Sequence, residues 1–468
     1  MGKIEDISVN KNDTIKEAMK RIDQGALGIA FVLDKEKRFL GVVTDGDIRR
    51  AILNGIDLKK PVNLIANESS VTVEKGWDRG KIMNILEKKN IPRRIPPHGT
   101  IKIPVLDEKK RVIDIIFASK KECVSYLKQH PKNKIESVKK ILVVGGAGYL
   151  GSILCRKLLD KNYQVRVLDN LTYGDLGIKD LYSHKKFEFI KGDMRDIQTV
   201  MKSVKDVDAV IHLAAIVGDP ASALKPQETI EINYLGTKML AEVCKYSQIN
   251  RFIFASTCSV YGASPTPETK IDEESDLNPV SLYAEMKLKS EQALLEISDE
   301  NFKPTILRMS TLYGLSPRMR FDLVVNILTI KALKEKKYTI FGGEQWRPNL
   351  HTKDAAEAYI NCIESSIQIS GGKIYNVGSD DENYKIIDIG KKIKQIIPDA
   401  EMEIDKGKDD ERNYNVSFEK INKELDYKTN FTITEGVMEI KEEVENGKFD
   451  DYTDQIYSNY RFLKEYGE

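Results

Sequence analysis

The sequence predicts an α/β protein in which a doubly wound parallel sheet and a smaller C-terminal lobe follow a small α+β region. Three observations support this. Apolar runs such as 141–144 alternate with helical patterns up to about residue 260, as expected for parallel strands buried on both faces. A glycine-rich turn directly follows the first of these runs. Before them, residues 1 to about 120 carry a weakly repeated helix and strand pattern.

The bulk composition narrows the class of protein. A chain of 468 residues is too long for one ordinary core, so two or three domains are expected. Lys and Arg number 73 and Asp and Glu 72, so no basic field indicates nucleic acid or an acidic membrane surface. The mean hydropathy is -0.39, and no apolar run could span a bilayer. The N-terminus has no apolar signal-peptide core, so a cytoplasmic protein is expected.

The cysteines fit the same compartment. The five, at positions 123, 155, 244, 258 and 362, are scattered and lack the spacing of metal ligands. We expect reduced thiols and no metal site.

The N-terminal region contains two similar halves. In the first, a helix over 14–22, strands over 28–34 and 39–44, and a helix over 45–53 are expected. The second repeats the pattern weakly, with a helix over 77–89 and strands over 102–107 and 111–117. This predicts a duplication of about sixty residues. The doublet resembles a tandem pair of cystathionine-β-synthase-type (CBS) modules, a family that often binds adenine nucleotides.

The best motif of that resemblance is Gly41-Val42-Val43-Thr44-Asp45-Gly46-Asp47. The resemblance implies that Thr44 lies near phosphate and Asp47 on ribose hydroxyls, with AMP, ADP or ATP as ligand. In the second half Asp114, Phe117 and Lys120 replace the Gly, Thr and Asp, which argues against a second nucleotide site. The alternatives are that Asp45 and Asp47 only cap a helix and that the module serves dimerisation. The predicted domains are 1–122, a linker over 123–138, and 139–468.

A dinucleotide-binding turn is expected at the start of the third part. Gly145, Gly148 and Gly151 lie between the strand 141–144 and a helix predicted over 152–160. A tight turn, a close approach to pyrophosphate and helix–strand packing each favour a residue without a Cβ. The strand 164–169 ends in Asp169, where an acid accepts hydrogen bonds from the adenine ribose and repels a 2′-phosphate. This favours NAD over NADP.

A catalytic pair is expected further along the chain. Tyr283 and Lys287 are four residues apart and therefore share a helix face. Thr257 lies upstream, in Ser256-Thr257-Cys258-Ser259-Val260-Tyr261-Gly262. A nearby ammonium lowers the pKa of a phenol and makes it a better base. A threonine hydroxyl can hold a reacting oxygen because it both donates and accepts.

This order of motifs resembles the extended short-chain dehydrogenases/reductases, the NAD-dependent nucleotide-sugar epimerase/dehydratase family. The resemblance implies a Rossmann-type sheet, NAD as cofactor, and Tyr283, Lys287 and Thr257 as catalytic residues, with Thr257 also on the substrate. The implied cofactor contacts are Gly145, Gly148, Tyr149, Leu150, Gly151, Asp169, Asn170, Asp193, Met194, Leu213, Ala214, Ala215, Asn233, Tyr283 and Lys287.

The resemblance also bears on the reaction and the substrate. Related 4,6-dehydratases carry an acidic pair after the Thr and related decarboxylases a Glu, whereas Cys258 and Ser259 stand here. This argues against dehydration and, less strongly, against decarboxylation. Arg347 matches the epimerases' arginine for the sugar-nucleotide phosphates. Thr311 replaces a usual Asn in diphosphate anchoring, for which Arg318 and Arg320 could compensate.

Three hypotheses follow. The favoured one is an NAD-dependent nucleotide-sugar epimerase, with Tyr283 as base and oxidation at a sugar carbon, C4 above all. The second is a nucleotide-sugar 4-dehydrogenase or 4-keto-sugar reductase, which needs the same residues. The third is a non-catalytic regulator that senses NAD and adenine nucleotides. Both modules resemble families that dimerise, so a homodimer or homotetramer is expected.

Overall fold

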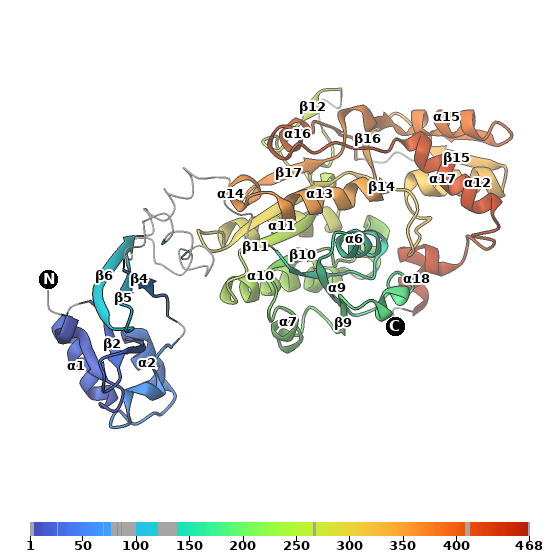
Figure 1. The fold of residues 1–468 in the computed structure, drawn as a ribbon. Coiled ribbons are helices and arrows are strands. Elements are labelled where there is room, and N and C mark those ends of the chain that lie inside the picture. Colours follow the sequence, from blue (N-terminus) through green and yellow to red (C-terminus); the bar gives the residue numbers. More distant parts are fainter. Residues whose placement is uncertain are drawn as a thin grey trace. The chain divides into compact units, whose positions relative to one another are not determined.

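The structure is a computed structural model, and the chain forms two compact units, residues 1–136 and 137–468, each described by itself (Figure 1). The described residues are 4–25, 27–68, 70–75, 82, 86, 100–119, 138–264, 268–407 and 412–466.

The second unit is built on a seven-stranded parallel sheet. Its strands lie in the order β17-β13-β11-β10-β7-β8-β9, and every pairing is parallel. Reversal of the winding direction between β7 and β10 creates the crevice where such sheets bind ligands. The bounds are β7 Lys140–Val144, β8 Gln164–Asp169, β9 Phe187–Lys191, β10 Ala209–His212, β11 Arg251–Thr257, β13 Lys303–Met309 and β17 Ile374–Val377.

Helices cover both faces of this sheet. Ile141 and Val143 of β7 pack into one core with α6 (Tyr149–Asp160) and α13 (Thr352–Glu364). Leu142 and Val144 of the same strand point to the opposite core, which contains residues of α10 (Thr237–Tyr246) and α11 (Leu282–Glu296). Alternate residues of β7 therefore pack into the cores on the two faces of the sheet, which explains why the run 141–144 is apolar throughout.

A smaller lobe follows the main part of the sheet. Its core joins α12 (Val324–Lys334), α15 (Ile386–Ile396) and α17 (Ile433–Glu445) to the parallel pair β15 (Lys337–Phe341) and β19 (Glu401–Asp405). The strands β14 (Thr311–Tyr313), β16 (Trp346–His351) and β18 (Asn383–Lys385) form a further sheet. A helix α18 (Asn459–Tyr466) packs against α8 (Asp219–Leu224) of the sheet region.

The first unit has two sheets with similar turns. One sheet contains β1 (Ser8–Asn10), β2 (Ile29–Leu33) and β3 (Phe39–Thr44), and it packs with α1 (Ile15–Gly25) and α2 (Asp45–Leu53). The other contains β4 (Val73–Glu74), β5 (Thr100–Leu106) and β6 (Val112–Ser119).

The duplication is visible in the turns of the first unit. Asp34 pairs with Arg38 after β2, and Asp107 pairs with Arg111 after β5. The two arginines meet in an antiparallel bridge. Asp34 and Asp107 are 73 positions apart (107 minus 34), so the predicted repeat of about sixty residues was too short. The spacing still matches Thr44 with Phe117 and Asp47 with Lys120, as the motif comparison expected.

Most predicted element positions agree with the structure to within a few residues. Two helix boundaries differ by three residues. The helix α1 ends at Gly25 rather than at 22, and α6 begins at Tyr149 rather than at 152 because its first turn forms directly from the glycine turn. The predicted helix over 77–89 and the predicted linker over 123–138 lie almost entirely outside the described residues. Among the helices that the structure describes, none is both long and apolar enough to cross a membrane.

Candidate active site

A cavity of about 650 Å³ lies at the carboxyl ends of the central strands. It gathers most of the predicted site residues from turns and strand ends that are distant in sequence. The predicted residues that line it are Gly145, Gly148, Tyr149, Leu150, Gly151, Asp169, Asn170, Asp193, Met194, Leu213, Ala214, Ala215, Thr257, Tyr283, Lys287, Arg318, Arg320 and Arg347.

The three glycines of the turn have different roles. Gly145 has φ +87°, and a Cβ there would lie 2.5 Å from the Ala214 nitrogen. A Cβ on Gly151 would collide with the Gly145 carbonyl oxygen. Gly148 caps the N-terminus of α6, and a Cβ there would meet only the Gly145 oxygen, at 3.6 Å. Two glycines are thus required by packing, while Gly148 leaves open space at a helix N-terminus, where pyrophosphate fits.

The acid at the end of β8 is held beside this turn. Asp169 accepts hydrogen bonds from the backbone nitrogens of Ala147 (3.0 Å) and Leu171 (2.9 Å). Burial raises the pKa of Asp169 above its ordinary value, and these two bonds oppose the shift. The carboxylate therefore lies in the wall of the cavity, where it suits a ribose diol. These residues fit NAD.

Asn233 differs from the other predicted cofactor contacts. It is fully buried and is not among the residues that line the cavity. Its side chain accepts a hydrogen bond from the Ile216 nitrogen at 2.8 Å and donates one to the Ile216 oxygen at 2.9 Å. Asn233 therefore fixes the segment after β10, whose Leu213, Ala214 and Ala215 reach the cavity.

Thr257 and Tyr283 meet in the cavity. Thr257 ends β11, and Tyr283 lies in the first turn of α11, whose N-cap is Ser281. Burial and the charge of Asp219 raise the pKa of Tyr283, while Arg320 and a hydrogen bond with Thr257 lower it. The net direction is upward. Lys287 is not among the groups with the largest effects on the pKa of Tyr283, so the lowering of this pKa by the lysine and the nicotinamide stays a prediction.

The Nζ of Lys287 donates a 2.7 Å hydrogen bond to the Ala255 carbonyl oxygen and lies 4.7 Å from the centre of the Phe254 ring. Only 2% of the residue is exposed. Burial lowers the pKa of Lys287 to about 7, so its charge depends on what binds nearby.

The catalytic helix is anchored by residues that the sequence did not identify. The Ser281 hydroxyl donates to Asp219 Oδ1 at 2.7 Å, and Arg412 pairs with Asp219 Oδ2 at 2.8 Å. Further along α11, Glu291 forms a fully buried ion pair with Arg308 of β13, at 2.8 Å. In the sequence, Asp219 stands in the segment 217–220, which follows β10, but no motif gives it a role.

The two residues after Thr257 do not supply an acid. Cys258 is buried, its Sγ donates to the Arg308 carbonyl oxygen at 3.3 Å, and burial raises the pKa of its thiol. Ser259 lies 3.1 Å from Thr257 Oγ1 and 3.3 Å from the Tyr414 hydroxyl. The four described cysteines are all free and buried.

Four arginines line the cavity, and one of them, Arg412, is the partner of Asp219. Arg347 donates to the carbonyl oxygens of Trp346 and Arg412 and lies 5.2 Å from the Tyr414 ring centre. Arg320 pairs with Asp322 at 2.8 Å. Arg318 is 3% exposed, and its guanidinium lies 4.7 Å from the Tyr173 ring centre.

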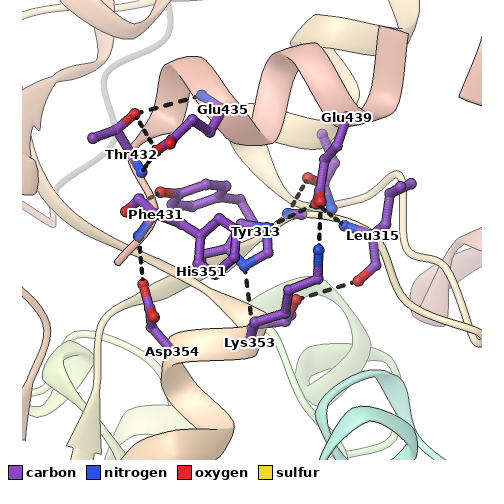
Figure 2. Close-up of polar contacts among 12 residues, drawn as sticks. Tyr313, Leu315, His351, Lys353, Asp354, Phe431, Thr432, Glu435 and Glu439 are labelled. Atoms are coloured by element: carbon purple, nitrogen blue, oxygen red, sulfur yellow. Dashed lines mark hydrogen bonds and ion pairs between the residues drawn. The ribbon is translucent and has the colours of Figure 1, made fainter. Parts of the chain in front are cut away.

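Residues of α6 and of α17 hold the loop that carries Arg318 and Arg320 from two sides. The Tyr149 hydroxyl of α6 donates to the Gly314 oxygen at 2.5 Å. On the other side, Glu439 of α17 accepts from the Leu315 nitrogen at 2.7 Å and bonds to His351 Nε2 at 2.7 Å. Figure 2 shows these groups gathered around the Glu439 carboxylate.

A third contact completes this cluster. Lys353 Nζ donates to Glu439 Oε2 at 2.9 Å. Burial raises the pKa of Glu439, but the hydrogen bond and charge of His351, together with the other two donors, lower it to about 2. The carboxylate therefore stays ionised and ties α17 to the arginine loop.

The predicted nucleotide residues of the first unit form a helix cap. Thr44 is the N-cap of α2, and its hydroxyl accepts from the Asp47 nitrogen at 3.2 Å. Asp47 Oδ2 accepts from the Thr44 nitrogen and hydroxyl at 2.8 and 2.7 Å. Arg50 donates to Asp47 Oδ1 at 2.5 Å. Thr44 and Asp47 are therefore hydrogen-bonded to each other in a capping box at the start of α2.

Comparison with known proteins supports the same reading of both units. The sequence profile of the NAD dependent epimerase/dehydratase family matches residues 141–378, and that of the CBS domain matches residues 3–54. The UDP-glucose 4-epimerase of Bacillus subtilis (strain 168) is 28% identical over 281 residues, 55% of this chain and 81% of the relative. The UDP-glucose 4-epimerase of Erwinia amylovora is 31% identical over 275 residues, 54% of this chain and 81% of the relative.

Solved structures agree. The UDP-glucose 4-epimerase of Thermotoga maritima with UDP-glucose gives a TM-score of 0.58 at 26% identity, over 66% of this chain and 99% of that one. The dTDP-glucose 4,6-dehydratase of Bacillus anthracis, in complex with NAD, gives 0.58 at 25%, over 66% and 98%. The family match covers half of the chain, and it confirms the resemblance inferred from Tyr283, Lys287 and the glycine turn. The chain is an NAD-dependent enzyme of the epimerase/dehydratase family, with a CBS domain before the catalytic unit.

Proposed function

We propose that this enzyme epimerises a nucleoside diphosphate sugar by transient oxidation at a sugar carbon, C4. The observation that carries the proposal is the meeting of Tyr283 and Thr257 in one cavity with the glycine turn. In this proposal Tyr283 is the base and Thr257 the hydroxyl that holds the reacting oxygen, next to the nicotinamide. Oxidation of a secondary alcohol needs these two groups.

Each residue has a defined task. NAD, when bound, supplies a reversible hydride acceptor. Tyr283 removes the proton from the sugar hydroxyl and returns it after the keto sugar has turned over in the site. Thr257 holds the reacting oxygen in line with the phenol. Because burial lowers the pKa of Lys287 to about 7, this lysine can adjust its charge to the negative charge that develops beside it.

The residues that follow Thr257 favour epimerisation over dehydration. Elimination of water needs a group that delivers a proton to the departing hydroxyl. Cys258 is buried with a raised pKa, and Ser259 is bonded to Thr257 and Tyr414, so neither suits that task. The names of the relatives include both UDP-glucose 4-epimerases and dTDP-D-glucose 4,6-dehydratases, which supports a UDP- or dTDP-sugar as substrate class.

The substrate phosphates are assigned to the arginines of the smaller lobe. Arg347 lines the cavity on the same side as Tyr414 and Ser259, close to Thr257. Arg320 lines it from the loop before α12 and influences the pKa of Tyr283. A guanidinium presents paired donors that match a diphosphate.

The test is incubation with a panel of nucleoside diphosphate hexoses deuterated at C4, followed by NMR. We expect inversion at C4 with the deuterium kept in the same sugar. Tyr283→Phe should reduce the rate at least about a thousandfold while the protein retains NAD. Tyr246→Phe, which removes the hydroxyl of an 81% exposed tyrosine on α10, is the matched control. A 4-keto-6-deoxy product would indicate a dehydratase, and accumulation of NADH a dehydrogenase. No change with any sugar would refute the proposal.

We further propose that an adenine nucleotide binds at Thr44 and Asp47 and alters catalytic activity. The CBS match over 3–54 supports this, as does the pairing of Asp47 Oδ1 with the exposed Arg50, a partner that a ligand could displace. Calorimetry with ATP, ADP and AMP on the wild type and on Asp47→Asn tests it. Absence of heat with all three would remove the idea.

We also propose that the working form is a cytoplasmic homodimer or homotetramer. Analytical ultracentrifugation would check the oligomeric state.

A further inference from the structure

One cationic side chain of the cavity, that of Arg318, forms no ion pair with any residue that the structure describes. Nε and Nη2 of Arg318 are buried and have no hydrogen-bond partner among the residues that the structure describes. The hydroxyl of Tyr173, whose ring lies under the guanidinium, is likewise buried without such a partner. Both residues line the cavity. A buried guanidinium without an anion is costly, so an unsatisfied one at a ligand cavity indicates an anionic ligand.

The backbone around Arg318 locates that anion. A Cβ on Gly177 would lie 3.2 Å from Arg318 Cβ and would collide with the Ala147 oxygen, so Arg318 and the glycine turn both lie next to Gly177. Ser316, two residues before Arg318, donates a hydrogen bond to the Tyr149 carbonyl oxygen at 2.7 Å. Arg318 thus lies beside the first turn of α6, where Gly148 leaves open space.

We propose that Arg318, supported by Tyr173, binds the diphosphate of NAD at the N-terminus of α6. The cavity must take two diphosphates, one from the cofactor and one from the substrate. Arg347 lies near Tyr414 and Thr257, and Arg320 is paired with Asp322, whereas Arg318 stands at the cofactor turn. Arg318 is therefore a cofactor ligand and does not compensate for Thr311 in substrate binding. The inference does not depend on which sugar the enzyme converts.

The site has a built support. The Tyr173 ring also packs edge-to-face against Phe462 of α18, with 5.6 Å between the ring centres. Leu463 of α18 packs into the cluster with Ile216, against which Tyr173 also lies. The guanidinium therefore rests on an aromatic ring that a C-terminal helix holds in place. Such stacking fixes the donor fork before the anion arrives.

The test is calorimetry on the full chain, stripped of bound nucleotide, with three probes: NAD⁺, adenosine and UDP. For Arg318→Met we expect NAD⁺ affinity to fall about 10- to 100-fold. Adenosine has no phosphate and UDP belongs to the other diphosphate site, so both should change less than about twofold. Arg318→Lys should lose less than Arg318→Met, because it keeps the charge without the fork. Arg461→Met, at an exposed arginine of the same unit, is the control.

Each outcome decides the matter. Unchanged NAD⁺ affinity in a folded Arg318→Met protein overturns the proposal. If Arg318→Met loses affinity for UDP instead of NAD⁺, the arginine binds the substrate and the proposal is overturned. An equal loss of affinity for adenosine also overturns the proposal, because adenosine has no phosphate. If Arg318→Met does not fold, Arg318→Lys and Tyr173→Phe decide, and unchanged NAD⁺ affinity in both refutes the proposal. A loss confined to NAD⁺ supports it.

Discussion

Replacing Glu439 by Gln should destabilise the catalytic unit by a predictable amount. The substitution keeps the side-chain shape and one acceptor oxygen, but it removes the charge and presents an amide to Lys353 Nζ. The pKa of Glu439 falls from 4.5 to about 2 in the folded chain. At about 1.36 kcal/mol per pKa unit this depression corresponds to about 3 kcal/mol of stability near pH 7.

The sign of the pH dependence follows from the lowered pKa. A carboxylate whose folded pKa is depressed stabilises the protein fully above its unfolded pKa, and this contribution is lost as pH falls toward the folded value. The difference in the free energy of unfolding between the wild type and Glu439→Gln should therefore shrink by about 1 kcal/mol from about pH 7 to about pH 4. Urea unfolding at both pH values measures the difference.

The control is Glu442→Gln, on an exposed position of the same helix, which should change stability by less than about 0.5 kcal/mol. A Glu439→Gln protein as stable as the wild type near pH 7 would refute the reasoning. So would a difference that stays constant down to about pH 4, because the carboxylate would then not be the titrating group.

Three further outcomes are expected. Asp219→Asn should shift the rising limb of the pH–rate profile to lower pH, because the charge of Asp219 raises the pKa of Tyr283; an unmoved limb would contradict this. Glu291→Gln should cost about 3–5 kcal/mol in urea unfolding, because it leaves the Arg308 charge buried and unpaired, and a cost below about 1 kcal/mol would count against it. Cys258 should resist alkylation in the folded enzyme, because burial raises the pKa of its thiol, and rapid labelling by mass spectrometry would disprove that.

Periodicity and motif order predicted the sheet and the cofactor turn well. The run 141–144, the glycine turn and the strand ending in Asp169 lie as expected, because strand burial and a tight turn are local properties that residue type determines. The start of α6 was wrong by three residues, because Gly148 is compatible with either a turn or a helix cap.

The rest of the site depends on contacts between distant segments. Lys287 bonds to the Ala255 carbonyl at the end of β11, a contact that the spacing of four residues from Tyr283 could not show. The pair of Asp219 with Arg412 joins segments far apart in the chain. Likewise, no sequence pattern could show that Arg320 has an acidic partner while the guanidinium of Arg318 faces a cavity.

The repeated turns of the first unit have a consequence for ligand stoichiometry. Positions 73 apart place Phe117 where the first half has Thr44, so only one half carries the hydroxyl and carboxylate that could receive a ribose phosphate. A chain of this kind should take up a single nucleotide with a hyperbolic saturation curve. Any sigmoidal response would then have to originate between chains, since one binding event within a chain cannot cooperate with itself.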